Sequence, residues 1–119
     1  MTLSGPKLWL HLEGLAVLCA TTFLYGSAGY SWGKFLLLFL APGLLMIGYA
    51  FGKAIGARIY NAGHTYVAPI LLLAVSRLTH HPYLLPLALI WIAHIAFDRL
   101  LGYGLKYPTA FKDTHLGRV

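Results

Sequence analysis

Residues 82–107 read PYLLPLALIWIAHIAFDRLLGYGLKY, and this stretch decides the fold class. Its first half is almost wholly apolar, and a helix of about 20 such residues crosses the hydrocarbon core of a bilayer. The run nevertheless continues into His94, Asp98 and Arg99, although the whole chain has only 3 acidic residues. The stretch therefore predicts a membrane-spanning helix that carries ionisable groups toward one end.

The composition of the whole chain agrees with a membrane protein. Of 119 residues, 59% are hydrophobic and 10% are charged, which is far more apolar than an ordinary soluble domain. The length suits one domain, residues 1–119. The net charge is +6, but the basic residues stand singly at the ends of apolar segments, so we expect no nucleic-acid partner. The single cysteine, Cys19, cannot form an intrachain disulfide.

Four apolar windows are long enough to cross a membrane as helices. They are residues 8–25, 32–51, 57–75 and 83–103. Short connections make neighbouring helices antiparallel, so the predicted fold is all-α, an integral membrane antiparallel four-helix bundle. His11 and Glu13 interrupt the first window, which a cleaved signal peptide would not allow, and we expect this helix to be retained.

Lysine and arginine predict the orientation of the bundle. With four spans the two termini share a side, and that side carries Lys7, Lys53, Arg58, Arg99, Lys106, Lys112 and Arg118. The opposite side carries only Lys34 and Arg77. The imbalance predicts cytoplasmic termini, a cytoplasmic tail over residues 108–119, and a multi-pass protein of the bacterial inner membrane.

Glycine and proline predict details of the helices. Gly48, Gly52 and Gly56 recur every four residues, a spacing that allows close helix contact within the chain or between copies in a homo-oligomer. Pro42 and Pro69 fall inside the second and third windows, where we expect each to bend its helix.

Polar residues of three spans fall in one layer near the cytoplasmic side. Glu13 lies two turns into the first span, Asn61 and His64 share a face of the third, and His94 and Asp98 share a face of the fourth. Ionisable groups inside a span are costly and usually face the bundle interior with a partner. We therefore predict a shared polar cavity, with Arg99 and Lys106 at its mouth and His115 folded back over it. His11, two positions from Glu13, is expected to point away.

The candidate site follows from this convergence. The candidate catalytic residues are Glu13, His64, His94 and Asp98. The candidate substrate-binding residues are Asn61, Arg99, Tyr103, Lys106 and His115. Each has a plainer interpretation too: Asp98 and Arg99 as a charge pair at a helix end, His64 as a hydrogen-bonded core histidine, and Asn61 as a contact between helices.

The C-terminal third, WIAHIAFDRLLGYGLKYPTAFKDTHLGRV (residues 91–119), resembles a family of small bacterial four-span membrane proteins. This is domain of unknown function family four-two-six-zero. The similarity extends to YNAGHTYVAP at residues 60–69 and to Glu13. The resemblance implies a four-helix membrane fold and no established chemistry. Members carry an acidic residue after the proline of the second span, where this chain has Gly43.

Three functions remain open at this point. The first is a membrane-embedded enzyme that uses acid–base or metal-assisted chemistry on a lipid-like or isoprenoid-like amphiphile. A divalent metal would take its ligands from His64, His94, Asp98 and His115, and haem held by His64 and His94 is a weaker alternative. The second is a small proton-coupled transporter built on Glu13, and the third is a membrane assembly protein whose polar residues only specify helix pairing.

Overall fold

A computed structural model describes residues 5–41, 48–106 and 114–118, and all regular structure in these ranges is helical. The helices in chain order are α1 (Gly5–Ser27), α2 (Trp32–Phe39), α3 (Lys53–His64), α4 (Val67–Thr79), α5 (Leu84–Leu101) and α6 (His115–Arg118). Pro42, Gly43, Lys112 and most of the predicted tail lie outside the described residues, so the expectations placed on them are not addressed.

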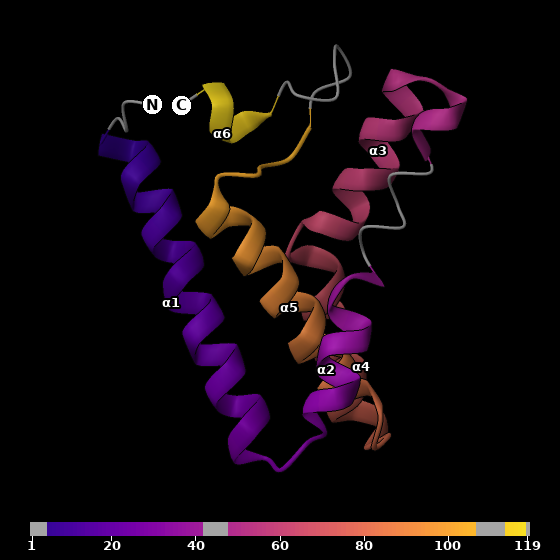
Figure 1. Cartoon of the computed structure of the whole chain (residues 1–119). Helices are drawn as coiled ribbons and strands as arrows, with labels where there is room; N and C mark the ends of the chain where they lie inside the picture. Colours follow the sequence, from indigo (N-terminus) through magenta and orange to yellow (C-terminus); the bar gives the residue numbers. More distant parts are fainter. Residues whose placement is uncertain (1–4, 42–47, 107–113, 119) are drawn as a thin grey trace.

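Helix α5 is the centre of the fold. Helix α1 packs along its length, and α4 and α2 pack against its other sides (Figure 1). The α1–α5 contact is close because Gly14 faces the backbone of Ala96 and Leu100, where a Cβ atom would lie 2.7 Å from the Leu100 nitrogen. On α5, Ala93 and Ala96 are fully buried. Small residues on both helices therefore bring the two backbones together.

Two of the four predicted spans are continuous helices. α1 and α5 correspond to windows 8–25 and 83–103, and both are long and apolar enough to cross a membrane. The third window is wrong as a single helix, because α3 ends at His64 and α4 begins at Val67. Thr65 has extended backbone (φ −97°, ψ 149°). Pro69 then falls in the first turn of α4, where its missing N–H costs nothing, so the chain breaks instead of bending.

The second window also differs from one straight helix. α2 ends at Phe39, and residues 48–51 form a tight turn before α3. Gly52 precedes α3 with φ +112°, a conformation that favours glycine. Gly48 and Gly56 make close contacts inside the chain, with Ile59 and Tyr49 respectively. These contacts agree with the intrachain interpretation of the glycine spacing, and the homo-oligomer stays a prediction.

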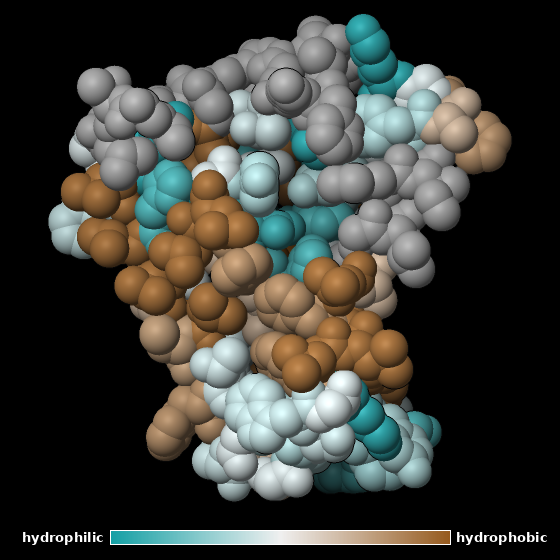
Figure 2. All heavy atoms as spheres, in the orientation of Figure 1, coloured by the Kyte–Doolittle hydropathy of each residue, from teal (hydrophilic) through white to brown (hydrophobic). Residues whose placement is uncertain are grey.

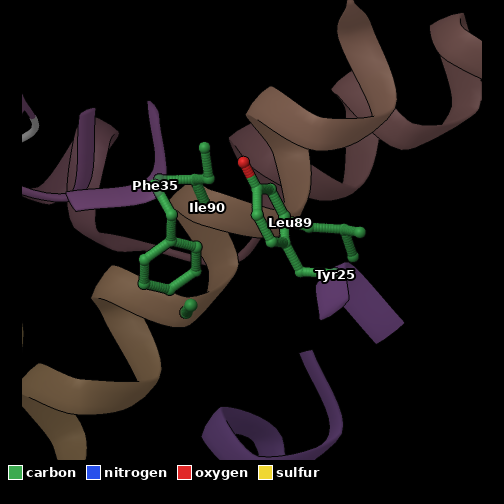
Figure 3. Packing of buried hydrophobic residues seen from close by; sticks show 5 residues of the cluster. Tyr25, Phe35, Leu89 and Ile90 are labelled. Atoms are coloured by element: carbon green, nitrogen blue, oxygen red, sulfur yellow. The ribbon is translucent and has the colours of Figure 1, made fainter. Parts of the chain in front are cut away.

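An aromatic cluster holds together the end of the molecule opposite α6. Tyr25 from α1, Phe35 from α2, and Leu89 and Ile90 from α5 pack together (Figure 3). The Tyr25 and Phe35 rings meet edge-on with centroids 5.1 Å apart. The Tyr25 hydroxyl also donates a hydrogen bond to the Ser31 carbonyl. This bond ties α1 to the start of α2 and fixes the turn between the two antiparallel helices.

The outer surface is apolar across its middle. Phe23 and Leu78 are 73% and 82% exposed, and Leu36, Leu37, Ile70 and Leu71 are exposed as well. Figure 2 shows apolar atoms as a band across one face, with paler, more polar atoms at the lower end. The start of α1 and helix α6 lie at the same, upper end of the molecule (Figure 1). Such a band is energetically unfavourable in water and is matched by lipid.

Candidate functional site

Three predicted site residues meet in the interior between α3 and α5. His64 is the last residue of α3, and His94 and Asp98 stand one turn apart on α5. The two Nε2 atoms of His64 and His94 are 3.3 Å apart. Asp98 Oδ2 lies 3.3 Å from His94 Nε2 and 3.7 Å from His64 Nε2. We call these three side chains the His–Asp cluster, and the structure brings together these three of the residues that the sequence placed at one depth.

The orientation of His64 is fixed by its own helix. Its Nδ1 atom lies 2.7 Å from the Tyr60 carbonyl, one turn earlier. A carbonyl only accepts, so Nδ1 carries the proton and Nε2 directs a lone pair at the cluster. The Tyr60 ring stacks on the imidazole at 3.7 Å with an interplanar angle of 4°. His64 is only 2% exposed, so the ring is held rigidly away from solvent.

His94 is held by packing rather than by hydrogen bonds on its outer edge. The Phe39 ring of α2 meets the imidazole edge-on with centroids 5.3 Å apart. The Nδ1 atom of His94 is buried and has no hydrogen-bond partner among the described residues. In the described part of the chain, the side chain of Asp98 is 16% exposed, against 9% for His94 and 3% for His64, so the carboxylate is the most open of the three groups.

The break after His64 is tolerated in apolar surroundings because side chains of α5 donate hydrogen bonds to the carbonyls at the end of α3. The indole of Trp91 donates to the Gly63 carbonyl at 2.6 Å, and Arg99 donates to the His64 carbonyl at 3.0 Å. A second Arg99 nitrogen donates to the Tyr103 carbonyl at 3.1 Å. Carbonyls at a helix end without such partners are costly away from water. Arg99, 9% exposed, therefore positions the end of α3 beside Asp98.

The segment after α5 is held to α3 and to α6 by two side chains. The Asn61 amide donates to the Lys106 carbonyl at 2.7 Å and accepts from the Lys106 N–H at 2.6 Å. His115 Nδ1 accepts from the Leu105 N–H at 2.7 Å, and the His115 N–H donates back to the Leu105 carbonyl at 2.9 Å. Gly104 leaves room for this imidazole, since a Cβ there would lie 2.6 Å from its Nδ1. His115 thus folds back onto the segment that follows α5, while its place over a polar cavity stays a prediction.

Two basic groups of this segment are partly removed from water. The Lys106 ammonium lies over the Tyr60 ring, 4.5 Å from its centroid. Burial lowers the pKa of Lys106, and the nearby Asp98 carboxylate opposes that shift. Burial and the positive charge of Arg99 lower the pKa of His115. Tyr103, in contrast, has an exposed side chain, and its backbone carbonyl accepts from Arg99.

Glu13 does not join the His–Asp cluster. It is exposed and lines a separate cavity of about 320 Å³ between α1 and α5, together with Tyr66 and Arg99. Leu10, Gly14 and Val17 form the apolar wall of this cavity. The expectation for His11 is wrong: its Nδ1 lies 2.7 Å from the Leu100 carbonyl, so it faces α5. Arg99 borders this cavity and also contacts His64, so it lies between the cavity and the His–Asp cluster.

The remaining predicted residues divide by their contacts. Asn61 and His115 are engaged by backbone groups, and His115 is outside the group of ligand-type atoms formed by His64, His94 and Asp98. The same geometry argues against haem held by His64 and His94. Two axial nitrogen ligands on opposite faces of haem stand about 4 Å apart, for metal–nitrogen bonds of about 2 Å. The two Nε2 atoms are only 3.3 Å apart.

Sequence reasoning missed Tyr60, Trp91 and Phe39. Tyr60 and Trp91 stand four and three residues before a cluster histidine, on the same helix faces, and that spacing is the signal that could have found them. Nothing in the sequence around Phe39 points to His94, because that contact depends on how α2 packs on α5.

Comparison with known families assigns the chain. The family model described as Domain of unknown function (DUF4260) matches residues 7–119, so the chain belongs to this family and the predicted resemblance is confirmed. A search of curated proteins and a search of solved structures each gave no match.

Proposed function

We propose that this DUF4260 member is an integral membrane enzyme whose His–Asp cluster performs acid–base chemistry on a lipid-like amphiphile. The observation that carries the proposal is the meeting of His64, His94 and Asp98 within 3.7 Å in a buried site. Three ionisable groups at this spacing are costly as packing alone, since buried polar groups need full partners. They are well suited to hold and transfer a proton near neutral pH.

The protonation pattern supports such a role. Because His64 Nδ1 donates to the Tyr60 carbonyl, its Nε2 is a base that faces His94 Nε2 at 3.3 Å. Asp98 lies on the same helix face as His94, and its Oδ2 atom is within 3.7 Å of both Nε2 atoms. A proton at one of these atoms can therefore pass between the two rings and the carboxylate over short distances. This is the arrangement that a general base requires.

The proposed substrate class follows from the neighbouring cavity. Leu10 and Val17 form an apolar wall that suits a hydrocarbon chain, while Glu13, Tyr66 and Arg99 suit a polar headgroup. Arg99 follows Asp98 in the chain and donates to the His64 carbonyl, so a headgroup bound there is next to the His–Asp cluster. In this proposal Arg99 binds the headgroup and His64 and His94 act on it.

The proposed topology is four crossings in the bacterial inner membrane with both termini in the cytoplasm. Support comes from the bias of lysine and arginine, from the exposed apolar band, and from the start of α1 and α6 at one end (Figure 1). In this topology α3 and α4 together make one crossing that is broken beside the His–Asp cluster. Irregular backbone at membrane depth is tolerated where protein groups satisfy it, as Trp91 and Arg99 do here.

Lipid analysis of cell membranes tests the proposed enzyme. Membranes with the wild-type chain are compared with membranes that carry His94→Gln or Asp98→Asn at equal abundance, and with His80→Gln as the matched control in an exposed loop. We expect one amphiphile to decrease and a related one to increase only with wild type and His80→Gln. Identical lipid profiles for wild type and the two cluster variants would contradict the proposal.

A proton-coupled transporter is the second candidate, and the position of Glu13 favours it. This carboxylate is exposed in a cavity of its own beside Arg99, as an alternating proton carrier would be. Proton-coupled flux in liposomes that is lost with Glu13→Gln and kept with Asp98→Asn would support transport. The enzyme predicts no flux and a strong effect of Asp98→Asn on the lipid profile.

A further inference from the structure

The arrangement of acceptor atoms in the His–Asp cluster is the starting observation. His64 Nδ1 carries the proton, so its Nε2 presents a lone pair. Asp98 Oδ2 presents lone pairs as well, and it lies 3.3 Å from His94 Nε2. If His94 is protonated at Nδ1, its Nε2 atom, His64 Nε2 and Asp98 Oδ2 are three acceptors that converge, and a cation at their centre would remove the repulsion between them.

The opposite tautomer of His94 leaves a different problem. A proton on Nε2 satisfies one contact in the cluster, but Nδ1 is then a buried acceptor with no partner among the described residues. A buried polar atom without a partner costs about 1–3 kcal/mol. His94 Nδ1 lacks a partner among the described residues in each of these forms, but only a cation between the two Nε2 atoms and the carboxylate oxygen engages all three converging atoms.

The distances match a tetrahedral metal ion. With zinc–nitrogen and zinc–oxygen bonds of about 2.0–2.2 Å, two ligand atoms of a tetrahedron stand about 3.3–3.6 Å apart. The three separations in the cluster are 3.3, 3.3 and 3.7 Å. An octahedral ion with similar bonds of about 2.1 Å would bring neighbouring ligands to about 3.0 Å, which is shorter than any of the three.

We infer that His64, His94 and Asp98 form a binding site for a divalent transition-metal ion, with zinc as the best match. Two imidazole nitrogens and one carboxylate oxygen are ligands that zinc prefers, and three protein ligands leave the fourth position for water or a substrate oxygen. The Tyr60 carbonyl supplies the outer hydrogen bond that orients His64, as second-shell partners do at metal sites.

This inference deepens the proposed function, because it names the ion at the same site, but it does not depend on catalysis. His115 is excluded from the ligand set: its Nδ1 accepts from the Leu105 N–H, and its imidazole is separate from the three clustered ligand atoms. The metal site predicted from the sequence thereby reduces from four ligands to three.

Metal titration of the full chain in nanodiscs tests the inference. The protein is stripped with a chelator and titrated with Zn²⁺, and separately with Co²⁺, whose visible absorption is intense in a tetrahedral site. We expect one tightly bound ion per chain and tetrahedral Co²⁺ absorption. His64→Gln, His94→Gln and Asp98→Asn should each weaken binding by more than about 100-fold, since loss of an outer partner alone costs about 10–100-fold.

Two controls separate the ligands from other imidazoles. The double variant His80→Gln/His81→Gln changes only exposed loop residues, and His115→Gln removes the fourth predicted ligand. Both should bind Zn²⁺ as wild type does. The inference is overturned if folded wild-type protein takes up no stoichiometric Zn²⁺, or if Asp98→Asn and His94→Gln bind it as tightly as wild type.

The two proposals fail in different ways. Stoichiometric Zn²⁺ together with an unchanged lipid profile would retain the metal site and reject the enzyme. A lipid change that requires His94, in protein that binds no Zn²⁺, would retain acid–base catalysis and reject the metal site.

Discussion

At the scale of single residues, the His–Asp cluster was predictable and its supports were not. The depth of each ionisable residue along its apolar run placed His64, His94 and Asp98 in one layer, and the structure brings them into contact. The same argument placed Glu13 with them, but depth says nothing about direction around a helix. Gly14 and His11 are on a side of α1 that faces α5, and Glu13 is turned into the neighbouring cavity.

The contact between His115 and Leu105 is expected to depend on pH. Burial and the charge of Arg99 lower the pKa of His115 from its ordinary 6.5, so the folded form binds its proton less readily than a released α6 does. The stabilisation by this group is present above 6.5 and is lost as pH falls through 6.5 toward the lower folded pKa. Protonation at Nδ1 also removes the acceptor for the Leu105 N–H.

Hydrogen exchange of the Leu105 amide measures this effect. After correction for intrinsic exchange, we expect faster exchange at about pH 5.5 than at about pH 7.5 in the wild type. His115→Gln is the matched control, because glutamine accepts a hydrogen bond but does not titrate in this range. Equal protection of the wild-type amide at both pH values would contradict the assignment.

At the scale of helices, hydropathy predicted α1 and α5 closely and failed for the broken third span. The window 57–75 is predicted as one helix bent at Pro69, and that proline alone does not distinguish a bend from the break between His64 and Val67. The break depends on Trp91 and Arg99, 28 and 35 residues away from the carbonyls that they satisfy. Long-range partners of this kind leave no periodic signal in the sequence.

The close approach of α1 to α5 predicts a strong effect at Gly14. Its Cβ would lie 2.7–2.8 Å from the Leu100 nitrogen, the Ala96 oxygen and Arg99 Cβ. Two of these atoms belong to helical backbone, so relief requires the helices to separate. We expect Gly14→Ala to destabilise the protein by about 1–3 kcal/mol.

Thermal unfolding in detergent micelles tests the role of Gly14. Gly5→Ala is the control in the same helix, because a Cβ at Gly5 meets nothing within 4 Å. Gly14→Ala should unfold at a clearly lower temperature than wild type, and Gly5→Ala should not. A wild-type unfolding temperature for Gly14→Ala would show that α1 does not pack on α5 as described.

At the scale of the whole molecule, the composition predicted a membrane protein with an apolar exterior, and the structure confirms that large apolar side chains are exposed. Large apolar side chains such as Phe23 and Leu78 are exposed, and two helices are long and apolar enough to cross a membrane. Four crossings, cytoplasmic termini and a homo-oligomer through Gly48, Gly52 and Gly56 stay predictions. They depend on the surrounding lipid and on other copies of the chain.

Cysteine labelling in intact cells tests the topology. In a Cys19→Ser background, single cysteines replace Lys7 at the start of α1 and His80 after α4. Four crossings with cytoplasmic termini predict that a membrane-impermeant reagent labels His80→Cys in intact cells and labels Lys7→Cys only after lysis. Labelling of both positions in intact cells would contradict the proposed topology.

The most direct measurement for the central claim is ¹⁵N NMR of the histidine side chains in nanodiscs, for wild type and Asp98→Asn. His94 is one turn from Asp98 and would respond in any helix, whereas His64 lies on α3 and responds only if the two helices meet as described. We predict that the substitution shifts the imidazole resonances of both His64 and His94 and leaves those of His80 and His81 unchanged. A shift for His94 with none for His64 would mean that there is no shared His–Asp cluster.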